Sequence, residues 1–176
     1  MGELTGKRIA VLVEEGFEDL ELWYPVLRLR EAGAKVDIIG TGSADEYKGK
    51  YGLSCPAEKN IGEVTADDYQ GLIVPGGWAP DKLRRYQKIL DFVRDIFMAN
   101  KPVGAICHAP WVLISARVLT GKTITSTVAV KDDVENAGAT WVDQSAVVDG
   151  NLISSRRPAD LPDFCRAFIA AFEGQE

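Results

Sequence analysis

The stretch PVGAICHAPWVL, residues 102–113, decides the fold, because it predicts a buried strand that turns sharply into a helix. The apolar run Val103–Ile106 has the length and composition of a buried strand. The residues from Ala109 onward are typical of a helix start, since proline is tolerated in a first helical turn. Cys107 and His108 therefore stand at the corner between a strand and a helix.

Outward from this corner, predicted strands and helices alternate along the whole chain. A Gly/Lys/Asp/Glu-rich connection without a clear period, at 41–68, is expected to hold one or two short strands. The Asp149-Gly150 pair between two apolar runs indicates a hairpin. Further strands are expected at 8–13, 35–40, 71–75, 123–130 and 140–143, and helices up to residue 30, at 80–100, at 109–118, before Gly138 and at 158–172. This pattern predicts one α/β domain over residues 1–176, with a mostly parallel sheet covered on both faces.

Composition and charge narrow the class of protein. Lys and Arg number 20 against 26 Asp and Glu, and the resulting net charge of −6 argues against binding to a nucleic-acid backbone. No apolar stretch is long enough to cross a bilayer, so neither a membrane partner nor a membrane span is expected. Three widely spaced cysteines suit free thiols in a reducing compartment, and we expect a cytoplasmic protein. A single histidine and three scattered thiols give no metal-site pattern, so no metal is expected.

Three corners follow predicted strands at the sheet edge where α/β proteins gather functional groups: 14–19, 75–79 and Cys107-His108. A thiol at a helix N-terminus has its thiolate favoured, so we expect a lowered pKa for Cys107. His108 is the one histidine of the chain and stands beside it. The alternative is that Cys107 is a small buried apolar residue, which is the interpretation we give to Cys55 and Cys165.

A cysteine nucleophile also needs an oxyanion hole and an acid that orients its histidine. Gly76-Gly77 allows a close backbone approach and is a candidate for the hole, although an ordinary turn would have the same sequence. The spacing leaves the acid open among Glu18, Glu21 and Asp81. The remaining acids of the first corner are expected to be solvated charges near a helix N-terminus: Glu14, Glu15 and Asp19.

Five blocks of sequence, in order, resemble the ThiJ/PfpI family of the class I glutamine-amidotransferase-like superfamily, and within it the intracellular protease I branch. The resemblance extends from about residue 7 to residue 172. The blocks are GFEDLELWYP (16–25), PGGWAPDKLR (75–84), AICHAP (105–110), VKDDVENAGATWVD (130–143) and VVDGNLISSRRPADL (147–161).

The resemblance implies a flavodoxin-like three-layer α/β/α sandwich with Cys107 as nucleophile on a strained elbow and His108 beside it. It also implies that Glu21 hydrogen-bonds the sulfur and that Asp81 reaches the histidine from a neighbouring subunit of a homodimer or hexamer. The oxyanion or substrate-binding region would comprise Gly76, Gly77 and Ala109. Asp81 replaces the glutamate of archaeal members.

A second departure is Thr127, which stands where many relatives carry an aromatic residue, and it suggests a more open pocket.

Three functions follow from the same thiol. The first is a cofactor-free hydrolase, a deglycase-like or glyoxalase-like enzyme acting on methylglyoxal or glyoxal adducts, in keeping with the absence of a glycine-rich phosphate loop. The second is a peptidase or amidase for short peptides. The third is a redox-responsive stress protein or chaperone with an oxidisable Cys107. A glutamine-amidotransferase triad would need a second histidine, which the chain lacks.

Overall fold

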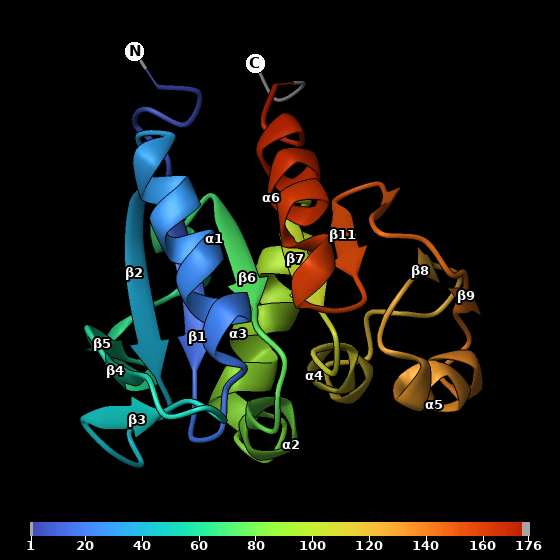
Figure 1. Cartoon of the computed structure of the whole chain (residues 1–176), viewed down its shortest axis with the longest axis horizontal. Helices are drawn as coiled ribbons and strands as arrows, with labels where there is room; N and C mark the ends of the chain where they lie inside the picture. The colour runs from blue at the N-terminus through green and yellow to red at the C-terminus, as the bar shows by residue number, and fades with distance from the viewer. Residues whose placement is uncertain (1, 174–176) are drawn as a thin grey trace.

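The computed structural model describes residues 2–173 and shows a central sheet between two layers of helices (Figure 1). The strands are β1 (Arg8–Val13), β2 (Lys35–Gly40), β3 (Glu46–Lys48), β4 (Ser54–Pro56), β5 (Lys59–Asn60), β6 (Gly71–Val74), β7 (Val103–Ile106), β8 (Thr123–Ile124), β9 (Thr140–Trp141), β10 (Val147–Asp149) and β11 (Leu152–Ser155). The helices are α1 (Asp19–Glu31), α2 (Ala79–Leu83), α3 (Gln87–Met98), α4 (Pro110–Ser115), α5 (Lys131–Asn136) and α6 (Leu161–Ala170). Short 3-10 turns are η1 (Ile61–Glu63), η2 (Ala66–Asp68), η3 (Val128–Val130) and η4 (Pro158–Asp160).

Seven strands form the main sheet in the order β10-β11-β7-β6-β1-β2-β5. All neighbours in it are parallel except β10 and β11, the hairpin predicted at Asp149-Gly150. Helices α1 and α6 pack together over one face, and α3 and α4 pack together over the other (Figure 1). The predicted α/β/α sandwich with a mostly parallel sheet is therefore confirmed.

The core strands are buried on both faces, which explains their continuous apolar runs. Every residue of β6 and β7 is buried, as are five of the six residues of β1. Helix α6 lies close over β6 and β7, because a Cβ at Gly104 would stand 2.8 Å from the ring of Phe164. The absence of a side chain at this position sets how closely the helix approaches the sheet.

Three predicted elements differ from the structure. The helix expected at 80–100 is two helices, because Tyr86 between them has extended backbone (φ −101°, ψ 113°). Apolar periodicity did not reveal the break, since both helices turn their apolar faces to the same core. The strand expected at 123–130 ends at Ile124, and the connection 41–68 holds three short strands rather than one or two. Pro25 lies inside α1, where a proline predicts a kink or a later helix start, but the helix begins at Asp19.

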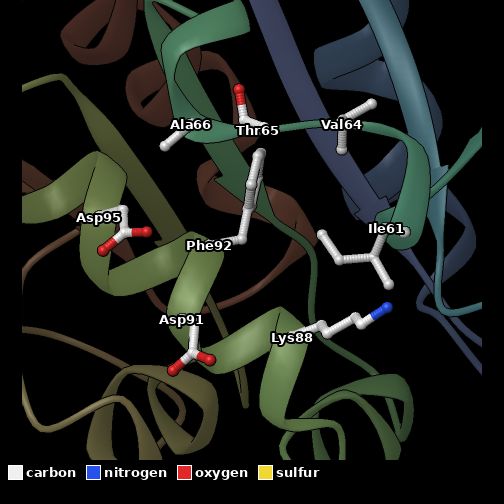
Figure 2. Close-up of a pocket in the computed structure, with 9 residues that line it drawn as sticks. Ile61, Val64, Thr65, Ala66, Lys88, Asp91, Phe92 and Asp95 are labelled. Atoms are coloured by element: carbon white, nitrogen blue, oxygen red, sulfur yellow. The ribbon is translucent and has the colours of Figure 1, made fainter.

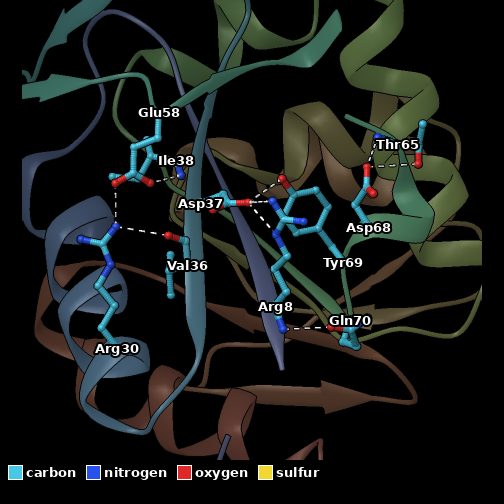
Figure 3. Close-up of polar contacts among 10 residues, drawn as sticks. All are labelled: Arg8, Arg30, Val36, Asp37, Ile38, Glu58, Thr65, Asp68, Tyr69 and Gln70. Carbon is cyan, nitrogen blue, oxygen red and sulfur yellow. Dashed lines mark hydrogen bonds and ion pairs between the residues drawn. The ribbon is translucent and has the colours of Figure 1, made fainter. Parts of the chain in front are cut away.

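A charged network is buried between β1, β2 and the segment before β6 (Figure 3). Asp37 is 5% exposed, and its Oδ2 accepts hydrogen bonds from Arg8 Nε at 2.7 Å and from the Tyr69 hydroxyl at 2.9 Å. The guanidinium of Arg8 also lies 5.0 Å from the centre of the Tyr69 ring. The two donors compensate the cost of burying the carboxylate.

Removing one of these donors gives a stability prediction. We expect Tyr69→Phe to lower the free energy of unfolding by about 1.5 kcal/mol, because the hydroxyl donates to a buried charge. The matched control is Tyr51→Phe at a residue that is 73% exposed, where the change should stay within about 0.5 kcal/mol. Urea denaturation measures both, and equal values for the two variants would contradict the assigned role of the hydroxyl.

Within residues 2–173, no helix combines the length and the apolar character that a bilayer crossing requires.

Candidate active site

The three predicted corners meet at one edge of the sheet, because β1, β6 and β7 are neighbours in it and run parallel. Cys107 directly follows β7 and has φ +64°, a left-handed conformation that is strained for a residue with a Cβ. Its N–H donates to the Ser155 carbonyl at 3.0 Å, and its carbonyl accepts from the Thr127 N–H at 3.1 Å. Backbone bonds on both sides therefore hold the bend on which the partly exposed thiol stands.

His108 lies within reach of the sulfur. Its Nδ1 is 3.2 Å from the Cys107 Sγ, and its ring centre is 5.1 Å from that of Trp111. Burial and the charge of Lys50 lower the pKa of His108 below its ordinary value near 6.5. The imidazole is consequently neutral at pH 7 and able to accept the thiol proton.

Glu21 contacts the Cys107 thiol. The side chain is fully buried, and its Oε2 accepts a hydrogen bond from the Gly76 N–H at 2.9 Å. Its Oε1 accepts no hydrogen bond from any of residues 2–173, while the carboxyl group lies against the Cys107 thiol. Burial, followed by the charge of Glu18, raises the pKa of Glu21 to about 8. Glu21 therefore carries a proton at neutral pH, and this proton is placed to be donated to the sulfur.

The predicted lowering of the thiol pKa is wrong for the resting protein. Burial and the Glu21 carboxylate raise the pKa of Cys107, and only the N–H groups of Gly77 and His108 act in the opposite direction. Helix α4 begins three residues after the cysteine, at Pro110, so the sulfur is not at the helix end. The contribution of the Glu21 carboxylate to the thiol pKa disappears once Glu21 is protonated, and burial remains as the main cause that raises it.

The predicted oxyanion residues differ in what their N–H groups do. The Gly77 N–H is directed at the sulfur, as is the N–H of His108, which sequence analysis did not propose. The Gly76 N–H is bound by Glu21, and the Ala109 N–H donates to the Ile106 carbonyl at 3.0 Å. The donors available beside the nucleophile are therefore those of Gly77 and His108.

The acid candidates differ in their positions and in their contacts. Glu18 is the N-cap of α1, where its Oε2 accepts from the Glu21 N–H at 2.9 Å. The side chain of Asp81 is 51% exposed on α2 and forms an ion pair with Arg85 at 2.5 Å. Within residues 2–173 of one chain, Asp81 makes no hydrogen bond or ion pair with His108. Its expected action from a neighbouring subunit stays a prediction.

The acids of the first corner are not all solvated, which corrects the sequence interpretation. Glu14 is 4% exposed and Asp19 is 3% exposed. Asp19 accepts hydrogen bonds from the N–H groups of Tyr51 and Leu53, both at 2.8 Å. These carboxylates hold the 41–53 segment against the sheet edge.

That segment supplies a cation which sequence analysis missed. The Lys50 ammonium lies 5.1 Å from the centre of the Trp78 ring, and its charge acts on both His108 and Glu21. The Gly- and Lys-rich sequence around it has no period that would have placed it at the site.

Two further observations concern a cavity away from the predicted site residues and the capacity of the described residues to bind a metal. A cavity of about 270 Å³ lies between the 61–66 segment and α3, and Figure 2 shows its lining side chains, which include none of the predicted site residues. The part of the chain from 2 to 173 contains no group of three or more His, Cys, Asp or Glu side chains able to hold a metal ion.

Comparison with known proteins places this geometry in a family. The sequence matches the DJ-1/PfpI family over residues 7–171. Deglycase PfpI of Pyrococcus furiosus is 42% identical over 162 residues, covering 92% of this chain and 97% of that protein. Protein/nucleic acid deglycase 2 of Escherichia coli is 44% identical over 162 residues, covering 91% of this chain and 94% of that protein.

Solved structures agree with the sequence match. A two-domain protein of Anabaena variabilis, with DJ-1/ThiJ/PfpI-like and ferritin-like domains, superposes with a TM-score of 0.92 at 40% identity. The match covers 95% of this chain and 48% of that longer one, so this chain spans about half its length. Drosophila melanogaster DJ-1beta superposes with a TM-score of 0.87 at 28% identity, covering 95% of this chain and 89% of that protein. The chain belongs to the DJ-1/PfpI family.

Proposed function

We propose that the protein is a cysteine-dependent, cofactor-free deglycase that removes methylglyoxal or glyoxal adducts from amines. The observation that carries the proposal is the 3.2 Å contact between the Cys107 Sγ and the neutral His108 Nδ1 on a strained bend. Relatives that bear the name deglycase, at 42% and 44% identity, support the same reaction class.

The residues divide the chemistry as follows. His108 takes the thiol proton as the sulfur attacks the adduct, while the protonated Glu21 stabilises the charge that develops on the sulfur. The N–H groups of Gly77 and His108 stabilise the oxygen anion formed on the attacked carbon. His108 then returns a proton to the leaving amine. The C–N bond breaks as the sulfur bonds to the attacked carbon, and a hydrogen shift from this carbon to the neighbouring ketone carbon gives a lactoyl thioester. One water then hydrolyses the S–C bond, which restores the thiol and releases lactate without any external oxidant or reductant.

Product analysis tests this assignment against the two alternatives. Wild-type protein is incubated separately with methylglyoxal-treated Nα-acetylarginine, with a fluorogenic peptide and with hydrogen peroxide. The proposal expects catalytic release of lactate from the adduct. Peptide cleavage without lactate would assign a peptidase, and a mass gain on Cys107 as the sole response would assign a redox protein.

The raised pKa of Glu21 gives a prediction for the pH profile. The protonated acid is present below its pKa of about 8 and is lost as pH rises through that value, so kcat/KM should fall above pH 8. Glu21→Gln keeps an acceptor for the Gly76 N–H and an N–H for the sulfur, and this variant should lack the fall. An identical alkaline limb in the two proteins would contradict the role given to Glu21.

We further propose that Asp81 completes the site of a neighbouring copy in a homodimer or hexamer. The exposure of its side chain on α2 and its separation from His108 within one chain support this arrangement. Asp81→Ala and Cys107→Ala would each be inactive alone. Mixing them after partial unfolding should restore part of the activity, because mixed oligomers would contain sites with both residues. No recovery, or a strict monomer by light scattering, would contradict shared sites.

A further inference from the structure

A second cavity, of about 280 Å³, is lined by segments that bond the backbone of Cys107. It is distinct from the cavity in Figure 2, and its walls come from the connection after β8, from the β9 region and from the segment after β11. The lining residues are Ser126, Thr127, Val128, Trp141, Asp143, Arg156 and Arg157.

Backbone bonds place this cavity next to Cys107. The Thr127 N–H donates to the Cys107 carbonyl, and the Cys107 N–H donates to the Ser155 carbonyl. Thr127 is itself a wall residue, and Arg156 and Arg157 directly follow Ser155. The two segments that hold the bend at Cys107 therefore both continue into the lining of the cavity.

One of the two arginines that line the cavity has no carboxylate partner among residues 2–173. The Arg156 guanidinium is bound by Asp160, at 2.9 Å from its Nε, and by Asp143, at 2.8 Å from its Nη1. Arg157 is exposed and forms no ion pair with any of residues 2–173. The Lys131 ammonium lies 5.4 Å from the centre of the Trp141 ring, which also lines the cavity. Arg156, Arg157 and Lys131 together exceed Asp143 and Asp160 by one positive charge.

We infer that this cavity binds an oxyanion carried by the substrate, a carboxylate or phosphate group close to the glycated amine. Arg157 is then the residue that selects anionic substrates, because a guanidinium presents several N–H donors in the geometry of a carboxylate or phosphate. The inference rests on the proposed function: the adduct carbon lies at the Cys107 sulfur while the anionic part of the same molecule occupies the cavity.

Matched substrates that differ only in charge test the inference. One pair is the methylglyoxal adducts of Nα-acetylarginine and of its amide, and the other is the adducts of guanosine 5′-monophosphate and of guanosine. Arg157→Gln should raise KM for the anionic member by about fivefold, the scale of an exposed charge pair, and leave kcat and the neutral member unchanged. Arg30→Gln is the control, since it removes the same charge on α1, which Figure 1 shows well apart from β8 and β9.

The outcomes separate the sources of the anion and the possible failures. A response confined to the first pair assigns a carboxylate, and one confined to the second assigns a phosphate. No response in either pair, an equal loss for charged and neutral members, or an equal loss in Arg30→Gln would overturn the inference.

A wild type that releases no lactate would instead refute the proposed function. Calorimetric titration with inorganic phosphate and with acetate then tests the cavity alone. Binding by the wild type that is lost in Arg157→Gln supports it, whereas absent or unchanged binding overturns it.

Discussion

Replacing Cys107 with alanine is expected to lower lactate release from methylglyoxal adducts by at least about a thousandfold, while the protein stays folded. In the proposed reaction the thiol attacks the adduct, and His108 Nδ1 lies 3.2 Å from the sulfur with the Glu21 carboxyl group against it. Alanine also has a Cβ, so the substitution does not change the strain of the left-handed backbone at φ +64°, and the bend itself should persist. Steady-state kinetics, with circular dichroism to verify folding, measures the effect.

The matched control removes a thiol from the core. Cys165 is 1% exposed on α6, and its burial raises the pKa of its thiol well above the ordinary value. Cys165→Ala should cost about 1 kcal/mol of stability and leave turnover unchanged. If Cys107→Ala retained a tenth of the wild-type rate, the nucleophile would have to be sought elsewhere.

Replacing Gly77 with alanine is expected to destabilise the protein by about 3 kcal/mol. Its φ of +79° is strained for any residue with a Cβ, and the added carbon would stand 2.4 Å from the Glu18 nitrogen and 2.6 Å from the Gly16 carbonyl oxygen. These are backbone atoms, which cannot rotate aside as a flexible side chain would. The first and second corners would have to separate, and the Gly77 N–H would be displaced from the sulfur.

Gly121→Ala separates the conformational cost of a Cβ at positive φ from the cost of its clash with neighbouring backbone atoms. Gly121 has a similar φ of +76°, but an added Cβ would have nothing within 4 Å. Its substitution should therefore show the conformational cost alone, about 1 kcal/mol. Chemical denaturation of both variants gives the comparison, and equal losses would mean that the close approach at Gly77 contributes nothing.

The sequence was sufficient for the sheet and for the meeting of the three corners. Runs such as Arg8–Val13 and Val103–Ile106 are buried on both faces, so their composition alone identified them. Because parallel strands place their carboxyl ends at one edge, the meeting of the corners 14–19, 75–79 and 107–108 followed from topology. The contact of Glu21 with the sulfur was expected from the family resemblance alone. The strained bend was expected from the family resemblance.

The structural features that the sequence did not reveal depend on contacts between segments that are far apart in the chain. The connection after Ile124 is not a strand, because the Thr125 N–H binds the Ser154 hydroxyl at 3.0 Å and the Thr127 N–H binds Cys107. The raised pKa values of Cys107 and Glu21 come from burial, which no spacing reveals. Lys50 reaches the site because its segment is anchored to the first corner, by Asp19 and by the bond from the Lys50 N–H to the Phe17 carbonyl at 2.7 Å.

The bend at Cys107 joins parts of the chain that are synthesised far apart. Its side-chain partner Glu21 belongs to the first helix, whereas the carbonyl that receives its N–H belongs to Ser155, on the strand before the last helix. No fragment that ends before β11 contains both. During refolding, catalytic activity should accordingly return in the slowest step that completes the sheet. The rate at which turnover returns therefore reports when the C-terminal quarter of the chain folds onto the rest.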